Sequence, residues 1–266
     1  MAVEYTREGS VGFITLNRPP ANSYEITFME ELERAIRAAA EDAGARAVVV
    51  RSALEKFFCA GADIKAFGEN TPEQNMAMCR LAHRALARIA AVPKVFIAQI
   101  AGHALGGGLE IALACDLRFG ADGTYSLGVP EATLGLLPGN GGTQRLPRLI
   151  GWSRALDLMI TGRRISPGEA QALGILDRVF PPDRLDAETL AYAQALTEGS
   201  ASAIGAIKLA VHQGRERPLD DGLRIERELL DGLFRSPDGQ EGVRAFIERR
   251  KPQFAPIVEP ADLQRG

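Results

Sequence analysis

Apolar and polar positions alternate along the first hundred residues with two different periods. Short β-branched runs have the continuity of buried strands, whereas longer segments repeat apolar residues every three to four positions, as amphipathic helices do. Thr71-Pro72-Glu73-Gln74 adds an N-cap followed by proline, which predicts a helix start. We therefore expect strands at 11–16, 45–51 and 94–100, helices at 27–42 and 71–91, and a loop at 52–67.

After residue 136 the pattern becomes mainly helical. Ser166-Pro167-Gly168-Glu169 predicts a short helix that Gly174 ends, and four longer helices are expected at 186–198, 203–213, 219–234 and 237–249. No low-complexity linker separates the two parts. The sequence thus predicts an α/β core with the active site in residues 1–190, built as a coiled ββα repeat, and a helical part in residues 191–266.

A glycine-rich segment, residues 101–115, leads from the strand at 94–100 into an apolar helix with one carboxylate, Glu110. No cation lies three or four positions away on that helix, and burying an unpaired charge costs several kcal/mol, of order 2–5. Two interpretations stay open at this point. Glu110 faces solvent in a first helical turn, or it is buried for a chemical reason.

The glycines at 106–108 fit neither common phosphate-binding pattern. No Gly-Lys-Ser/Thr follows them, and their spacing is not that of a dinucleotide fingerprint. They either permit close packing of helix on strand, or expose backbone N–H groups that bind a developing oxyanion. The loop Cys59-Ala60-Gly61-Ala62-Asp63 is a candidate for the second N–H group.

Glu131 follows Pro130 in a loop that continues to the glycines of segment 139–142. A surface glutamate is the simpler interpretation of this residue. Two carboxylates with two candidate N–H donors instead suggest proton transfer next to a carbonyl. Cys59 has no histidine evident as a partner, so we interpret it as a structural thiol, and a thioesterase with a cysteine nucleophile is disfavoured.

Composition narrows the function further. The chain has 266 residues, a net charge of −3 and a pI near 5.8, which argues against nucleic acid as a partner. No apolar run is long enough to span a bilayer, and no targeting pattern is seen, so we expect no membrane association. Three cysteines and three histidines lack metal-ligand spacing. We therefore expect no metal site and a cytoplasmic location.

Taken together, the motifs resemble the crotonase superfamily, specifically the enoyl-CoA hydratases, from about Val11 to Phe254. Each motif is weak alone, but their order is specific. The segments that carry the resemblance are residues 12–19 (GFITLNRP), 58–65 (FCAGADIK), 104–110 (ALGGGLE), Pro130-Glu131, 139–147 (GNGGTQRLP), 158–163 (LMITGR) and 246–254 (FIERRKPQF). The resemblance implies a spiral of ββα turns with C-terminal helices, assembled as a homotrimer or a dimer of trimers.

The resemblance also implies roles for single residues. The N–H groups of Ala62 and Gly107 would bind a thioester oxygen, while Glu110 and Glu131 would hold one water, with the backbone of Gly139 near it. Coenzyme A would enter only as part of the acyl-CoA substrate, with no other cofactor. Its nucleotide would lie near Lys56 and Lys65, and Arg249 stands where many members carry a lysine that a neighbouring subunit contributes. The residues expected to contact CoA are Lys56, Ala60, Ala62, Asp63, Ile64, Lys65 and Arg249.

Three departures from the family pattern concern the acyl pocket. Asn22-Ser23-Tyr24 replaces the usual Asn-Ala-Leu at the acyl entrance, Leu127 replaces a usual phenylalanine, and segment 116–130 is one residue longer. The pair of glutamates favours hydration of a trans-2-enoyl-CoA to a 3-hydroxyacyl-CoA. An enoyl-CoA isomerase or other crotonase-type acyl-CoA enzyme, and a non-catalytic binding member, remain alternatives. The resemblance is compatible with fatty-acid β-oxidation and with breakdown of amino acids or aromatic acids.

Overall fold

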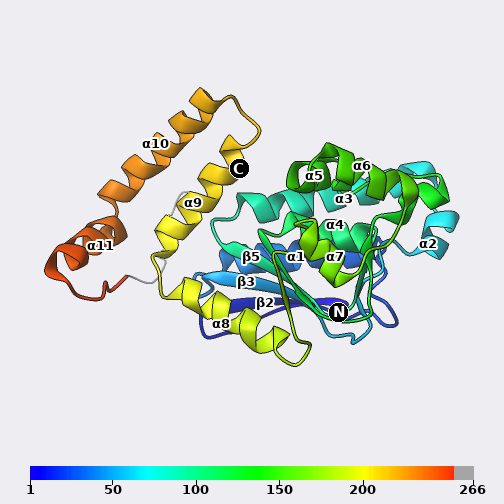
Figure 1. Ribbon diagram of the computed structural model, residues 1–266, viewed down its shortest axis with the longest axis horizontal. Coiled ribbons are helices and arrows are strands. Elements are labelled where there is room, and N and C mark those ends of the chain that lie inside the picture. Colours follow the sequence, from blue (N-terminus) through cyan, green and yellow to red (C-terminus); the bar gives the residue numbers. More distant parts are fainter. Residues whose placement is uncertain (255–266) are drawn as a thin grey trace.

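A six-stranded sheet forms the centre of the molecule. The computed structural model describes residues 1–254 (Figure 1). The strand order is β1-β2-β3-β5-β7-β9; β1 pairs antiparallel with β2, and every other pair is parallel. The strands are β1 (Val3–Glu8), β2 (Val11–Leu16), β3 (Ala47–Ser52), β5 (Val95–Ile100), β7 (Leu117–Ala121) and β9 (Arg178–Phe180).

A second sheet has three parallel strands, and each of them follows a strand of the large sheet in the chain. Its order is β4-β6-β8, with β4 (Phe57–Cys59), β6 (His103–Leu105) and β8 (Leu127–Gly128). Strand β3 is followed by β4, β5 by β6, and β7 by β8, and helices follow each pair. This alternation between two sheets is the coiled ββα repeat that the sequence predicts.

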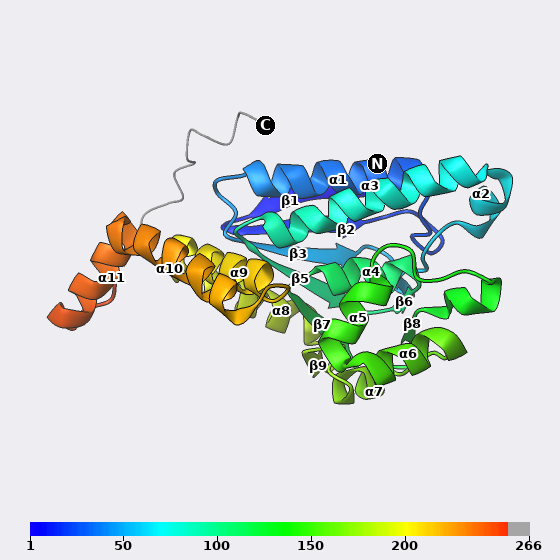
Figure 2. The ribbon, with the colours of Figure 1, turned by 90° about the horizontal axis from the view of Figure 1, so that it is seen from above.

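Helices cover both faces of the large sheet. Helix α1 (Ile26–Glu41) packs on α3 (Pro72–Ala91) and on strands β1 and β2, whereas α8 (Leu185–Thr197) packs on β2, β3, β5 and β7. Helix α4 (Gly107–Ala114) contacts α3, α5 and the small sheet (Figure 2). The remaining elements of this part are α2 (Ile64–Glu69), the 3₁₀ helix η1 (Pro130–Leu134), α5 (Gly142–Ile150), α6 (Trp152–Thr161) and α7 (Pro167–Ala172).

The last three helices, α9 (Ala201–Gly214), α10 (Leu219–Arg235) and α11 (Pro237–Glu248), project away from the sheets in both ribbon views (Figures 1 and 2). Lys208 joins α9 to the rest of the molecule. Its ammonium donates to the carbonyls of Ile89 and Lys94 at 2.6 Å each, and pairs with Asp116 at 2.9 Å. His212, one helical turn later, also bonds Asp116, at 2.8 Å.

Most predicted elements agree with the structure to within one or two residues. The predicted division at residue 190 stays a prediction, since α8 spans that position, and residues 255–266 of the helical part lie outside the described residues. The predicted loop at 52–67 was wrong, because it contains β4 and the start of α2, both too short to show a period. Strand β1 was missed because most of its side chains are polar, as is common in an edge strand.

Candidate active site

The glycine segment makes a close approach of three chain segments possible. Gly106 has φ of 54°, a value that favours glycine, and it caps the N-terminus of α4. A Cβ on Gly107 would lie 1.8 Å from the Tyr24 hydroxyl oxygen, and one on Gly108 would lie 2.1 Å from the Cys59 carbonyl oxygen. Gly107 is the first residue of the helix, so its N–H has no acceptor within α4. The close packing that the glycines were expected to permit is confirmed, and the binding of an oxyanion by the Gly107 N–H stays a prediction.

Glu110 is buried, with only 1% of its surface exposed. One carboxylate oxygen, Oε1, accepts hydrogen bonds from the backbone N–H groups of Asn140 at 2.8 Å and Gly142 at 2.6 Å. No salt bridge reaches this carboxylate from residues 1–254. The solvent-facing interpretation of Glu110 was wrong, because packing by α3 and α5 covers the first turn of α4.

The environment of Glu110 raises its pKa to about 7. Desolvation is the largest cause, and the nearby negative charge of Glu131 adds to it. The two N–H bonds, from Gly142 and Asn140, and the charge of Arg145 act in the opposite direction. A carboxyl group with such a pKa exchanges a proton easily at neutral pH, which suits acid–base catalysis.

Glu131 lies in the first turn of η1, and Pro130 opens that turn. Its Oε1 is 2.9 Å from the position that a Cβ on Gly106 would take, so the carboxylate faces the start of α4. Its Oε2 is buried and has no hydrogen-bond partner among the described residues. Burial raises the pKa of Glu131 as well. The simpler interpretation of Glu131, a surface glutamate, holds only in part, because the residue is half-buried and one of its carboxylate oxygens is covered.

Ala62 lies in the loop between β4 and α2 and forms an isolated parallel bridge with Tyr24. The Tyr24 N–H donates to the Gly61 carbonyl at 2.9 Å, and the Asp63 N–H donates to the Tyr24 carbonyl at 2.8 Å. Because the bonds of a parallel bridge use the residues on either side of Ala62, its own N–H points away from Tyr24. A Cβ on Gly61 would lie 3.3 Å from the Gly107 nitrogen. The loop that contains Ala62 therefore lies against the start of α4, where Gly107 presents the other candidate N–H group.

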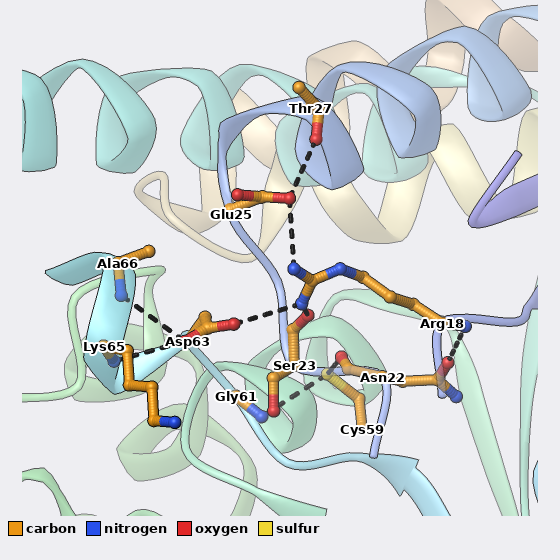
Figure 3. Close-up of polar contacts among 10 residues, drawn as sticks. All are labelled: Arg18, Asn22, Ser23, Glu25, Thr27, Cys59, Gly61, Asp63, Lys65 and Ala66. Atoms are coloured by element: carbon orange, nitrogen blue, oxygen red, sulfur yellow. Dashed lines mark hydrogen bonds and ion pairs between the residues drawn. The ribbon is translucent and has the colours of Figure 1, made fainter. Parts of the chain in front are cut away.

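Asp63 serves the local structure of this loop (Figure 3). Its carboxylate caps α2 by accepting from the N–H groups of Lys65 and Ala66, and it pairs with Arg18 at 3.3 Å. These bonds lower the pKa of Asp63, the one from Ala66 most. Arg18 also donates to the Ser23 carbonyl and pairs with Glu25, so this cluster fixes the loop against the residues that precede α1.

The other residues expected to contact CoA differ in position. Ile64 and Lys65 are exposed at the start of α2, which follows this loop, and Lys56 is exposed directly before β4. The Ala60 N–H donates to the Ala21 carbonyl. Arg249 follows α11, and in both ribbon views α11 and α2 lie at opposite ends of the molecule (Figures 1 and 2). Within one chain, the structure does not bring Arg249 to the other predicted residues.

Gly139 directly precedes Asn140, whose N–H donates to Glu110. Its carbonyl is 2.7 Å from Nε2 of His83, and a Cβ on it would lie 3.6 Å from the Cys79 sulfur. The structure also brings in residues that the sequence analysis did not single out, namely Asn140, Gly142 and Arg145. Their roles depend on backbone groups and long-range contacts, for which the chain gives no local signal.

Cys59 is not placed as a nucleophile. Its thiol is buried, donates to the Asn22 carbonyl at 3.0 Å, and has a pKa that burial raises to about 12. Among residues 1–254 no cluster of three or more His, Cys, Asp or Glu side chains could hold a metal ion. Within the same residues, no helix is both long and apolar enough to cross a membrane.

Comparison with known proteins places this geometry in context. A model of the enoyl-CoA hydratase/isomerase family matches residues 6–256. A probable enoyl-CoA hydratase of Mycobacterium bovis is 42% identical over 249 residues, which cover 93% of this chain and 95% of that protein. The short-chain-enoyl-CoA hydratase of Clostridium acetobutylicum is 35% identical over 246 residues, covering 92% of this chain and 94% of that protein.

A solved structure is similar over nearly the same length. The enoyl-CoA hydratase of Geobacillus kaustophilus superposes with a TM-score of 0.94 at 43% identity, covering 96% of this chain and 97% of that one. The α/β fold with alternating sheets and C-terminal helices is thus shared over 96% of this chain.

Proposed function

We propose that this chain, which belongs to the enoyl-CoA hydratase/isomerase family, is an enoyl-CoA hydratase. Such an enzyme adds water across the 2,3 double bond of a trans-2-enoyl-CoA. The observation that carries this proposal is the buried carboxylate of Glu110, with the charge of the half-buried Glu131 near it, beside the start of α4 and the loop of Ala62. Neither Glu110 nor Glu131 forms a salt bridge with residues 1–254, and desolvation raises the pKa of both carboxyl groups. Hydration of a conjugated thioester gives two such groups a use.

The N–H groups of Ala62 and Gly107 bind the thioester oxygen in this proposal. Negative charge builds on that oxygen when the nucleophile adds at C3, so these donors stabilise the transition state more than the ground state. The N-terminus of α4 adds the positive end of its dipole at the same place.

Glu110 and Glu131 hold the reacting water between them. The water oxygen bonds to C3 while one carboxylate takes the proton that it loses, and the other carboxyl group gives a proton to C2. The product gains one hydroxyl group and one hydrogen, the elements of water, while a proton has in effect moved from one glutamate to the other, so the net protonation of the pair is unchanged. The two groups are coupled, so the pair as a unit carries the acid–base function.

The substrate's CoA moiety lies along the exposed lysines Lys56 and Lys65 beside the oxyanion loop, where two positive charges suit a polyanionic nucleotide. No further cofactor is proposed, since hydration needs only proton transfer and carbonyl polarisation. The free thiols of Cys59, Cys79 and Cys115 support the prediction of a cytoplasmic location.

The C-terminal helices support a homotrimer or a dimer of trimers. Large apolar side chains on them are exposed in the single chain, and a groove of about 590 Å³ lies along α10 and α11. Assembly would also let a neighbour's Arg249 approach the CoA site. The exposed side chains are Ile207, Val211, Phe234, Val243, Phe246 and Ile247. Sedimentation as a monomer at micromolar concentration would contradict this assembly.

The test of function is a panel of acyl-CoA thioesters of varied chain length and double-bond position. Purified protein is expected to remove the conjugated absorbance of 2-enoyl-CoAs and to yield 3-hydroxyacyl-CoA. Conversion of 3-enoyl to 2-enoyl thioesters without hydration would instead indicate the isomerase. Inertness toward every thioester would overturn the assignment as an enzyme of this family and favour a binding member.

A further inference from the structure

Two buried polar side chains next to the pair of glutamates have no part in the chemistry so far. Tyr24 and Asn140 are each 4% exposed, and the Asn140 side-chain amide donates to the Tyr24 hydroxyl. They come from distant parts of the sequence, Tyr24 before α1 and Asn140 before α5. Tyr24 is also one of the three residues by which this chain departs from the family pattern. A phenylalanine or leucine would fill apolar space there without a polar group to satisfy.

Tyr24 contacts both candidate oxyanion donors. Its backbone N–H and carbonyl bond the residues on either side of Ala62, which fixes that loop. Its hydroxyl oxygen lies 1.8 Å from the position of a Cβ on Gly107, so the side chain packs directly on the start of α4. One residue therefore sets the spacing between the loop of Ala62 and the helix of Gly107.

Through Asn140 the same residue reaches the acid–base pair. The Asn140 N–H is one of the two donors to Glu110, at 2.8 Å, and its carbonyl accepts from the Arg145 guanidinium at 2.8 Å. The Asn140 side chain is thus the third attachment of a residue whose backbone orients the carboxylate of Glu110. Without the Tyr24 hydroxyl, that side-chain amide would lose the acceptor that it has in this buried place.

We propose that Tyr24 is a positioning residue for the hydration, and that its hydroxyl, by accepting from Asn140, holds the backbone N–H that orients Glu110 against the oxyanion donors. The inference rests on the proposed function, but the orientation of the Glu110 carboxylate can be tested without catalysis. The hydroxyl stays protonated in this role, because burial and the nearby charge of Glu110 hold the pKa of Tyr24 well above its ordinary value.

The test is Tyr24→Phe, which keeps the ring and removes only the hydroxyl. Tyr125→Phe is the matched control, because Tyr125 is also buried and its hydroxyl bonds two backbone carbonyls, of Ile100 and Ala121, outside the site. In Tyr24→Phe the kcat should fall about 10-fold with little change in KM, as expected for one lost hydrogen bond that acts on the transition state. Tyr125→Phe should keep the wild-type kcat.

A second readout does not depend on catalysis. Carboxyl-carbon NMR titration of Glu110 should show a higher pKa in Tyr24→Phe than in wild type, because a looser Asn140 N–H stabilises the carboxylate less. The Tyr125→Phe protein should titrate as wild type. An unchanged Glu110 pKa with an unchanged kcat in folded Tyr24→Phe would overturn the inference. If wild type itself hydrates no enoyl-CoA, the proposed function fails, and the titration still decides the positioning role.

Asn140→Ala removes the same hydrogen bond from the other side and serves if Tyr24→Phe does not fold. When both single variants fold, the double variant completes a cycle. If Tyr24 acts through Asn140, the double variant should be no slower than the slower single variant. Multiplying rate losses in the double variant would show two independent effects and would contradict the inference.

Discussion

Two charged clusters, each with one member in the segment from Glu110 to Asp116, are built in opposite ways. Glu110 and Glu131 are two acids that form no salt bridge with residues 1–254, and one oxygen of Glu131 has no hydrogen-bond partner there. Asp116, at the end of the same α4 segment, pairs with Lys208 at 2.9 Å and His212 at 2.8 Å. The first cluster raises the pKa of its acids, and the second satisfies its charges.

The difference distinguishes acids suited to proton transfer from an ion pair that stabilises the fold. Asp116 and Lys208 neutralise each other and attach α9 to the sheets. Their attraction offsets the cost of removing the two charges from water. The glutamates are two acids of like charge, and the charge of Glu131 adds to the cost of ionising Glu110. Natural proteins keep such destabilising arrangements where function requires them. The contrast therefore supports the assignment of the glutamates as the acid–base pair.

The largest expected effect is on catalysis by Glu131→Gln. Removing one acid–base group and loosening the reacting water should lower kcat/KM by about 10³-fold or more. The fold should keep its stability, since the carboxylate has an oxygen without a partner to lose. The check is the initial rate of hydration of a short 2-enoyl-CoA together with thermal unfolding.

The opposite result is expected in the paired cluster. Lys208→Met should lower the free energy of unfolding by about 3–5 kcal/mol, because it leaves the buried Asp116 with less compensation. The kcat of the folded fraction should stay unchanged. Urea unfolding measures the first and steady-state kinetics the second. Arg235→Ala, which breaks the exposed Arg235–Asp231 pair, is the control and should leave the midpoint where it is. A loss of kcat in folded Lys208→Met would break the comparison.

The pH dependence of stability should differ between wild type and Glu110→Gln. The pKa of Glu110 is about 7 in the folded protein against an ordinary 4.5, so the folded state binds more protons between these values. Wild-type stability from this group is therefore full below pH 4.5 and is lost as the pH rises through 7, by roughly 3 kcal/mol. The glutamine variant lacks that loss. Its advantage in Tm should appear above pH 5 and grow to pH 8; equal curves would contradict the burial cost.

The smallest expected effects come from two neighbouring residues, Asp63, which caps α2, and Lys65, which is proposed to contact CoA. Asp63→Ala should lower the free energy of unfolding by about 1 kcal/mol through loss of the α2 cap. Lys65→Ala should leave stability unchanged and raise the KM for enoyl-CoA a few-fold, roughly the effect of one screened charge. Equal KM values for Lys65→Ala and wild type would remove that lysine from the CoA site.

Regular elements with a clear end signal could be predicted from the sequence. Strand β2 has the predicted bounds, and α3 begins at the predicted Thr71 cap, where both bonds of the capping box form. Strand β4 and helix α2 could not be predicted, since three and six residues carry too little periodicity. The order of the motifs along the chain was sufficient to predict the family and the fold.

The site shows a sharper limit. Glu110 could be singled out because it is a lone carboxylate in an apolar helix, and Glu131 because it lies among glycines and prolines. Asn140 could not, because its effect on Glu110 comes from a backbone N–H that any residue there would possess. Its link to Tyr24 joins positions 116 residues apart, which only the folded chain reveals.

The most direct test of the central claim is the hydration rate of Glu110→Gln at pH 8, measured with saturating 2-enoyl-CoA. Glutamine keeps the shape of the side chain and an oxygen that can accept from Asn140 and Gly142, but it exchanges no proton. The account predicts a kcat about 10³-fold or more below wild type in a protein that is at least as stable. A kcat within a few-fold of wild type would contradict the claim that this buried carboxyl group is kept for proton transfer.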